Sequence, residues 1–219
     1  VAAFERTSLR WIADLLGLPP DAAGAFVSGA SAGNLCGLAA ARHAVLASAG
    51  WDVDAQGLFG APAVTVVVGH EVHPSVTKAL GVLGFGRERP MRVPVDSQGR
   101  MRADRFPRLT GPSIVCLQAG NVNTGAFDPI SEITEQAHRD GAWVHVDGAF
   151  GLWAQASPRL RHLCDGIAQA DSWATDAHKW LNVPYDSGIA LVKDGEALRA
   201  AMAVTASYLP TASEERNPS

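Results

Sequence analysis

The sequence predicts an α/β fold in which a mostly parallel β-sheet is covered by helices on both faces. Short runs rich in valine, isoleucine and alanine alternate along the chain with longer helical patterns, an order typical of βαβ units. Several of these runs, such as 64–68, are almost wholly apolar, as expected of strands buried on both faces. Because ligands of such sheets bind beyond the carboxyl ends of the strands, functional side chains are expected directly after these runs.

The expected elements follow one another from the start of the chain. An amphipathic pattern over 4–16 indicates a helix, and the turn at 17–21 ends it. A short strand at 25–27 leads through a turn of small residues, 28–34, into an alanine-rich helix over 35–49. The remaining expected strands are 64–68, 91–95, 113–117, 143–146, 172–175 and 188–192, and the remaining helices are 75–83, 130–139 and 195–202.

Composition excludes several classes of partner. The 219 residues are 47% hydrophobic and 18% charged, which suits one sizeable domain with a large core. A net charge of -4 argues against nucleic acid, which requires a basic surface, and the apolar runs are too short to span a bilayer. Cys36, Cys116 and Cys164 lie far apart, which predicts reduced thiols. We expect a cytoplasmic protein without a membrane partner.

The pair His178-Lys179 lies between two expected strands, with no amphipathic helix in the pattern to explain it. A lysine placed in this way pairs with a phosphate as an ammonium or, once desolvated, forms a Schiff base with a carbonyl. The second use predicts an aldehyde cofactor. Pyridoxal phosphate further requires a carboxylate at the ring nitrogen, a phosphate site and a flat group against the ring.

Other expected strand ends offer these groups. Asp147 follows one strand and suits the ring nitrogen, although an aspartate that caps the following turn has comparable weight. The turn 28–34, with Ser31, suits a phosphate at a helix N-terminus, but it lacks the P-loop and dinucleotide signatures. His73 or His70 suits ring stacking, and the spacing does not choose between them.

A metal site is disfavoured at this point of the chain. The sequence His-Glu-Val-His at 70–73 has the wrong spacing for the helical zinc motif, and Pro74 prevents a helix from continuing through it. In the loop 120–128, the amides and Thr124 suit the cofactor or a carboxylate, and a plain turn is the alternative.

Five segments, taken in their order and spacing, resemble the group II pyridoxal-phosphate-dependent amino-acid decarboxylases. They are 28–34, 73–76, 125–128, 147–149 and 178–180. This family includes the aromatic-L-amino-acid and glutamate decarboxylases and has the aspartate-aminotransferase-like fold, fold type I. The resemblance extends from residue 4 to about residue 208, and the lysine segment is its most specific part.

The resemblance implies a role for each matching residue. Lys179 would bind the cofactor covalently and Asp147 would bond the pyridine nitrogen. The ring would lie between His73 and Ala149. Phosphate contacts would come from Ala30 and Ser31, with His178 close by, and Tyr208 would donate a proton after carbon dioxide leaves. The full expected cofactor site comprises Ala30, Ser31, His73, Asn121, Thr124, Asp147, Ala149, Asp176, His178 and Lys179.

Three positions depart from the family pattern. Asn121 and Val122 replace threonines that many relatives carry, so a hydroxyl contact is lost or moves to Asn121 or Asn123. Asp176 stands where relatives often have asparagine or serine, which brings an acidic group near the expected phosphate.

The expected activity is decarboxylation of an L-amino acid to an amine. His73, in place of the glutamine of some glutamate-specific relatives, favours an aromatic substrate, and Tyr208 rather than phenylalanine favours simple decarboxylation. The alternatives are another lyase or an aldehyde-forming enzyme with the same cofactor, or a non-catalytic interaction domain. The family implies a homodimer. Because the chain starts without methionine, we expect a fragment, the large cofactor domain over 1–219, without the family's N-terminal segment and C-terminal small domain.

Overall fold

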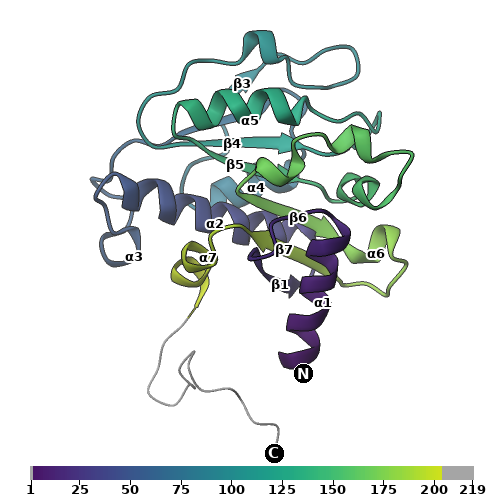
Figure 1. Cartoon of the computed structure of the whole chain (residues 1–219). Coiled ribbons are helices and arrows are strands. Elements are labelled where there is room, and N and C mark those ends of the chain that lie inside the picture. The colour runs from purple at the N-terminus through teal and green to yellow at the C-terminus, as the bar shows by residue number, and fades with distance from the viewer. Residues whose placement is uncertain (1, 204–219) are drawn as a thin grey trace, which may run out of the picture.

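A seven-stranded mixed sheet forms the centre of the protein, as a computed structural model that describes residues 2–203 shows (Figure 1). The strand order is β1-β7-β6-β5-β4-β2-β3. Strands β2 to β6 run parallel to one another, and β7 is antiparallel to both β6 and β1. The predicted α/β fold with a mostly parallel sheet is therefore confirmed. The strands are β1 (Ala23–Val27), β2 (Thr65–Gly69), β3 (Met91–Val93), β4 (Ser113–Gln118), β5 (Trp143–Asp147), β6 (Ser172–Asp176) and β7 (Gly188–Val192).

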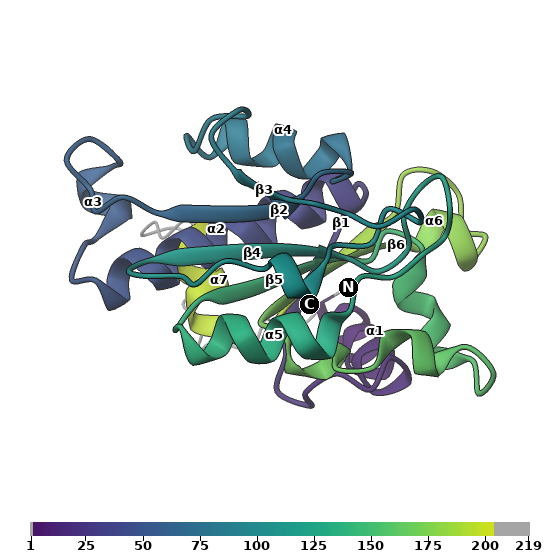
Figure 2. The ribbon, with the colours of Figure 1, turned by 90° about the horizontal axis from the view of Figure 1, so that it is seen from above.

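Helices cover both faces of the sheet, as Figure 2 shows from above. Helices α2, α4 and α7 lie over one face, and α1 and α5 lie over the other. The helices are α1 (Ala2–Leu15), α2 (Ala30–Ser48), α3 (Val53–Gln56), α4 (Pro74–Val82), α5 (Ile130–Arg139), α6 (Ala177–Trp180) and α7 (Gly195–Met202), with 3₁₀ turns at η1 (Ala103–Arg105), η2 (Gly151–Ala156), η3 (Arg161–Cys164) and η4 (Ile167–Gln169).

Two apolar cores, one on each face, hold these layers together. On the α2 face, side chains such as Leu38 and Leu80 pack against Ile114 of β4, and all three are fully buried. On the α1 and α5 face, Ile133 belongs to the same cluster as Trp173 of β6, which is also fully buried. Successive residues of a strand point to opposite faces, so an apolar run such as that of β4 serves both cores.

The structure corrects the expected elements at two places that matter for the site. Helix α2 begins at Ala30 rather than at residue 35, because the second half of the small-residue turn is already helical. His178 and Lys179 lie in a short helix, α6, where the sequence pattern indicated none. The N–H groups of Ala177 and His178, at the start of this helix, both donate to the carbonyl of Ser187.

Within residues 2–203, no helix combines the length and the apolar character that crossing a membrane requires. The three cysteines are free.

Candidate active site at the carboxyl edge of the sheet

Candidate side chains from four strand ends meet at one edge of the sheet. Asp147 is the last residue of β5 and Asp176 is the last residue of β6. The segment 28–30 follows β1, and His73 follows β2 shortly before α4. A cavity of about 310 Å³ opens here, within the range of small-molecule sites. It is lined by Ser28, Gly29, Ala30, Ser31, Ala32, His73, Ser75, Ala149, Asp176, His178, Lys179 and Asp186.

Lys179 reaches the cavity from α6 and forms an ion pair there. Its Nζ atom lies 2.9 Å from Oδ2 of Asp176, one helical turn earlier, and 5.9 Å from the centre of the Phe150 ring. The lysine side chain is 40% exposed, whereas the Asp176 side chain is only 6% exposed. The amine is therefore held at the cavity rim by a buried carboxylate while it stays open to a ligand.

Asp176 also closes the N-terminus of α2. Its Oδ1 atom accepts a 2.6 Å hydrogen bond from the backbone N–H of Ala30. The N-cap residue, Gly29, supplies no side-chain bond of its own. The N-terminus of a helix binds anions because its first N–H groups are unpaired and carry partial positive charge. In this chain a carboxylate from β6 already satisfies one of those groups.

The turn before α2 fits against β7 because Gly188 has no side chain. A Cβ added to Gly188 would overlap the backbone of Gly29, so the two segments approach at van der Waals distance only with glycine there. The position of the start of α2 thus depends on a residue far away in the sequence.

His178 is fixed by two neighbours. Its Nδ1 atom accepts a 3.0 Å hydrogen bond from the N–H of Ser187, and its ring stacks on Tyr185 with 3.9 Å between the ring centres. Because Nδ1 accepts, a neutral ring carries its proton on Nε2, which lies 3.4 Å from Oδ1 of Asp176. Sequence reasoning missed Tyr185 and Ser187, since their role depends on how the loop after α6 folds back.

Asp147 lies buried behind the cavity. Its Oδ2 atom accepts from Nδ2 of Asn34 at 3.1 Å and lies 3.4 Å from the hydroxyl of Ser75, and its Oδ1 atom accepts from the N–H of Ala149 at 3.2 Å. Burial raises the pKa of this carboxyl, while the hydrogen bonds from Asn34 and Ala149 lower it. The bond to Ala149 is the turn cap that sequence reasoning gave as the alternative.

His73 lines the cavity, and His70, which is exposed, does not. His73 is the N-cap of α4. Its Nδ1 atom accepts from the N–H of Ser75 at 3.2 Å and lies 2.7 Å from the Ser75 hydroxyl. The ring is thereby fixed at the edge of the cavity. Because Nδ1 accepts, a neutral ring carries its proton on Nε2.

Asn121 and Thr124 do not line this cavity. Oδ1 of Asn121 accepts from the N–H of Asn123 at 2.9 Å, and its amide donates to Glu71. The hydroxyl of Thr124 donates to the carbonyl of Gln98 at 2.7 Å. Asn121 thus bonds its own loop and the segment after β2, and Thr124 bonds the turn that contains Gln98. Tyr208 lies outside the described residues.

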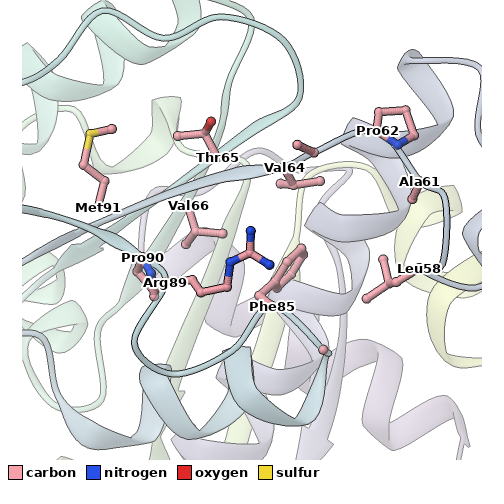
Figure 3. A pocket seen from close by; sticks show the side chains of 12 residues that line it. Leu58, Ala61, Pro62, Val64, Thr65, Val66, Phe85, Arg89, Pro90 and Met91 are labelled. Carbon is pink, nitrogen blue, oxygen red and sulfur yellow. The ribbon is translucent and has the colours of Figure 1, made fainter.

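Two further hollows differ in their relation to Lys179. One of about 500 Å³ lies at the start of β2, away from the carboxyl ends of the strands, where Val64, Arg89, Phe85 and Leu58 are among the lining residues (Figure 3). The other, of about 490 Å³, shares Phe150 with the surroundings of Lys179. We call it the apolar cavity; it is lined by Gly125, Phe127, Phe150, Gly151, Trp153, Ala154, Ala156, Ser157, Leu160, Leu163 and Trp180.

Comparison with known proteins identifies the family. The sequence profile of the pyridoxal-dependent decarboxylase conserved domain matches residues 1–216. The chain belongs to this decarboxylase family. The aromatic-L-amino-acid decarboxylase of Bacillus atrophaeus is 32% identical over 213 residues, which are 94% of this chain and 42% of that protein. The acidic amino acid decarboxylase GADL1 of Mus musculus is 34% identical over 195 residues, which are 85% of this chain and 35% of that protein.

The fold of this decarboxylase-family chain is also found in solved structures. The crystal structure of Oryza sativa TDC with PLP and tryptamine superposes with a TM-score of 0.83 at 27% identity, over 94% of this chain and 45% of that one. The predicted fold type I architecture is confirmed, and the family cofactor is pyridoxal phosphate. The chain spans less than half the length of these three relatives.

The residues of the cavity fit this cofactor. A primary amine, the N-terminus of a 19-residue helix and an imidazole line one space of about 310 Å³, and the buried carboxylate of Asp147 lies behind its lining residues Ser75 and Ala149. Their chemistry corresponds to the aldehyde, the phosphate, the ring face and the ring nitrogen of pyridoxal phosphate. Asp176 is the one group whose charge opposes a phosphate there.

Proposed function

We propose that this chain is the cofactor-binding large domain of an amino-acid decarboxylase, and that Lys179 is the lysine that holds pyridoxal phosphate. The observation that carries the proposal is the convergence of the Lys179 amine, the N-terminus of α2 and the buried Asp147 carboxylate at one edge of the sheet. A non-catalytic scaffold has no need to keep these three groups together. The N-terminal segment and small domain of the family would complete the site.

Each residue has a defined task in this proposal. Pyridoxal phosphate, when bound, supplies the electron sink for the bond that breaks as carbon dioxide leaves. Lys179 would provide the amine that holds the cofactor and that the amine of the substrate would replace. Asp147 would accept a hydrogen bond from the protonated ring nitrogen, and His73 would restrict one ring face. Tyr208 returns a proton to the carbon that loses the carboxylate.

We further propose an aromatic amino acid as the substrate. The apolar cavity beside Lys179 supports this choice, since none of its lining residues carries a charge and Phe127, Phe150 and Trp180 contribute aromatic rings. An acidic side chain would require a cationic partner there. Relatives named for aromatic and for acidic substrates are comparably similar to this chain, so the cavity and not the similarity supports the choice.

A homodimer belongs to the same proposal. Trp180 and Tyr185, which follow Lys179 near the carboxyl edge of the sheet, are 68% and 76% exposed. Large aromatic side chains of this kind are enriched in the cores of protein interfaces. Sedimentation equilibrium tests this part of the proposal, and a monomer at micromolar concentration would contradict it.

The deciding experiment is an absorbance spectrum of the purified chain with added pyridoxal phosphate, before and after borohydride reduction, followed by peptide mapping. We expect a visible band that reduction removes, with the cofactor fixed on Lys179. The Lys179→Arg variant is the matched control, since it keeps the positive charge beside Asp176 and cannot form the bond. A band that survives in this variant, or a label on Lys78 or Lys193, would overturn the assignment.

A further inference from the structure

A chain of buried hydrogen bonds runs from Trp143 to Asp147 on the α2 face of the sheet. Nε1 of Trp143 donates to the hydroxyl of Ser172 at 2.9 Å. The same hydroxyl lies 2.8 Å from Nδ1 of His145, and Nε2 of His145 lies 2.9 Å from Oδ1 of Asn34. Nδ2 of Asn34 then donates to Asp147 at 3.1 Å. Ser172, His145 and Asn34 are fully buried, and the NH₂ group of Asn34 also donates to the hydroxyl of Ser75 at 3.1 Å.

The fold makes room for this chain. His145 and Asp147 point to the same face because they lie two residues apart in β5. Gly37 of α2 passes directly over the imidazole, and a Cβ there would come within 2.8 Å of its Nδ1 atom. The histidine ring therefore has a close-fitting site between β5 and α2.

The direction of each hydrogen bond follows from the chemistry of its donor. An indole nitrogen only donates, so Ser172 accepts from Trp143 and its own proton is free for Nδ1 of His145. Burial lowers the pKa of His145 to about 3, so its ring is neutral and has one donor and one acceptor. If Nδ1 accepts, the proton is on Nε2 and is donated to the oxygen of Asn34.

The amide of Asn34 passes this orientation on to Asp147. With its oxygen fixed by His145, the amide directs its NH₂ group to the Asp147 carboxylate, which as an anion only accepts. The reversed arrangement places the proton on Nδ1 of His145 and turns the Asn34 oxygen toward Asp147. That arrangement requires a protonated Asp147, so the tautomer of His145 and the charge of Asp147 are linked.

Ser75 does not replace Asn34 in this role. Nδ1 of His73 accepts from the backbone N–H of Ser75 and lies 2.7 Å from its hydroxyl, whereas Asp147 is 3.4 Å from that hydroxyl. The hydroxyl proton of Ser75 therefore goes to His73. Asn34 is the side-chain donor that opposes the effect of burial on Asp147.

We propose that Asn34 and His145 are positioning residues that keep Asp147 in its anionic form. The proposal rests on the proposed function in one respect, namely that an anionic Asp147 is the partner of the cofactor's ring nitrogen, where a charged acceptor binds a protonated donor more strongly than a neutral one does. Neither residue touches the cavity, and both act through Asp147.

Nuclear magnetic resonance of the cofactor-free chain tests the proposal directly. We expect the ¹⁵N shifts of His145 to show a neutral ring with its proton on Nε2 from pH 5 to pH 8. In Asn34→Leu, we expect the labelled carboxyl carbon of Asp147 to titrate at a higher pH than in the wild type. A proton on Nδ1 of His145, or an unchanged titration of Asp147, would overturn the proposal.

A milder variant and a control separate this role from a merely structural one. Ser172→Ala removes only the hydroxyl that fixes the His145 tautomer. We expect both tautomers of His145 to be populated in this variant and Asp147 to titrate at a higher pH than in the wild type. Thr134→Val removes a hydroxyl that is fully buried in α5 and has no hydrogen-bond partner among the described residues, and it should change neither signal. If Thr134→Val changed both signals as Ser172→Ala does, the effect would come from general packing and not from the hydrogen bond of Ser172.

Cofactor titration adds a second signal. Since a hydrogen bond to a charged group contributes enough to change an equilibrium about tenfold, Asn34→Leu should weaken binding of pyridoxal phosphate roughly tenfold while Lys179 remains the labelled residue. Unchanged affinity would contradict the positioning role. Absence of binding by the wild-type chain would contradict the proposed function and leave the resonance test of Asn34 and His145 in force, so the two failures are distinguishable.

Discussion

Nζ of Lys179 and Oδ2 of Asp176 form a 2.9 Å ion pair at the rim of the cavity. The same carboxylate accepts from the first N–H group of α2, so one side chain connects the lysine to the helix N-terminus. A phosphate at that terminus would meet this negative charge. The Asp176 carboxylate therefore stabilises the lysine ammonium and opposes the binding of a phosphate.

Replacing Asp176 with asparagine should strengthen binding of inorganic phosphate about tenfold. The amide oxygen can still accept from Ala30, while the repulsion between two close negative charges in a partly buried site is removed. Isothermal titration with phosphate measures the change. Asp14→Asn on α1 alters the net charge equally and should leave the affinity unchanged. Equal or weaker binding by Asp176→Asn would show that the carboxylate supports the anion site.

Replacing Asp147 with asparagine should separate cofactor binding from turnover. The substitution keeps the side-chain volume and a hydrogen-bond acceptor, so we expect the cofactor still to be fixed on Lys179 by borohydride. Decarboxylation should fall by orders of magnitude, because a neutral amide cannot hold the ring nitrogen protonated. Parallel measurements of labelling and of carbon dioxide release check this, and a rate near that of the wild type would refute the role of Asp147.

His145 should make the chain sensitive to acid. The pKa of a histidine in the unfolded chain is about 6.5, and in the fold burial lowers the pKa of His145 to about 3. Below pH 6.5 the unfolded chain thus binds a proton that the folded chain does not. The free energy of unfolding should fall by up to about 1.4 kcal/mol per pH unit as pH decreases toward 3.

The difference between the wild type and His145→Gln isolates this effect. Urea unfolding at pH 6.5, 5.5 and 4.5 should show the stability advantage of the wild type shrinking as pH falls. Asp128 acts in the opposite direction, because burial raises its pKa to about 6 and it gains stability as pH falls through that value. It is present in both proteins and cancels in the difference. A difference independent of pH would mean that His145 is charged in the fold.

Adding a methyl group at Gly188 should disrupt the anion site. In Gly188→Ala the new Cβ would overlap the backbone of Gly29, so β7 and the start of α2 must separate. We expect a loss of about 1–3 kcal/mol in the free energy of unfolding together with weaker phosphate binding. Gly69→Ala is the matched control, since its Cβ would meet Val95 at an ordinary 3.6 Å. A similar loss in both variants would contradict a specific role for Gly188.

The order of the elements could be read from the sequence because it depends on local signals. Fully apolar runs predicted the buried strands, and α2 and α4 end within one residue of their predicted ends. Helices α5 and α7 have the predicted bounds. The start of α2 was misplaced by five residues because small residues suit a turn and a first helical turn equally well.

The sequence by itself determined the fold class, the family and the strand ends that carry Lys179, Asp147 and His73, because residue type and spacing record these directly. Only the tertiary structure decided which partners these groups have. It paired Asp176 with both Lys179 and Ala30, and it placed His145 and Asn34 behind Asp147. Hydrogen bonds between residues more than a hundred positions apart depend on how α2 packs across β5 and β6, and no local pattern encodes that packing.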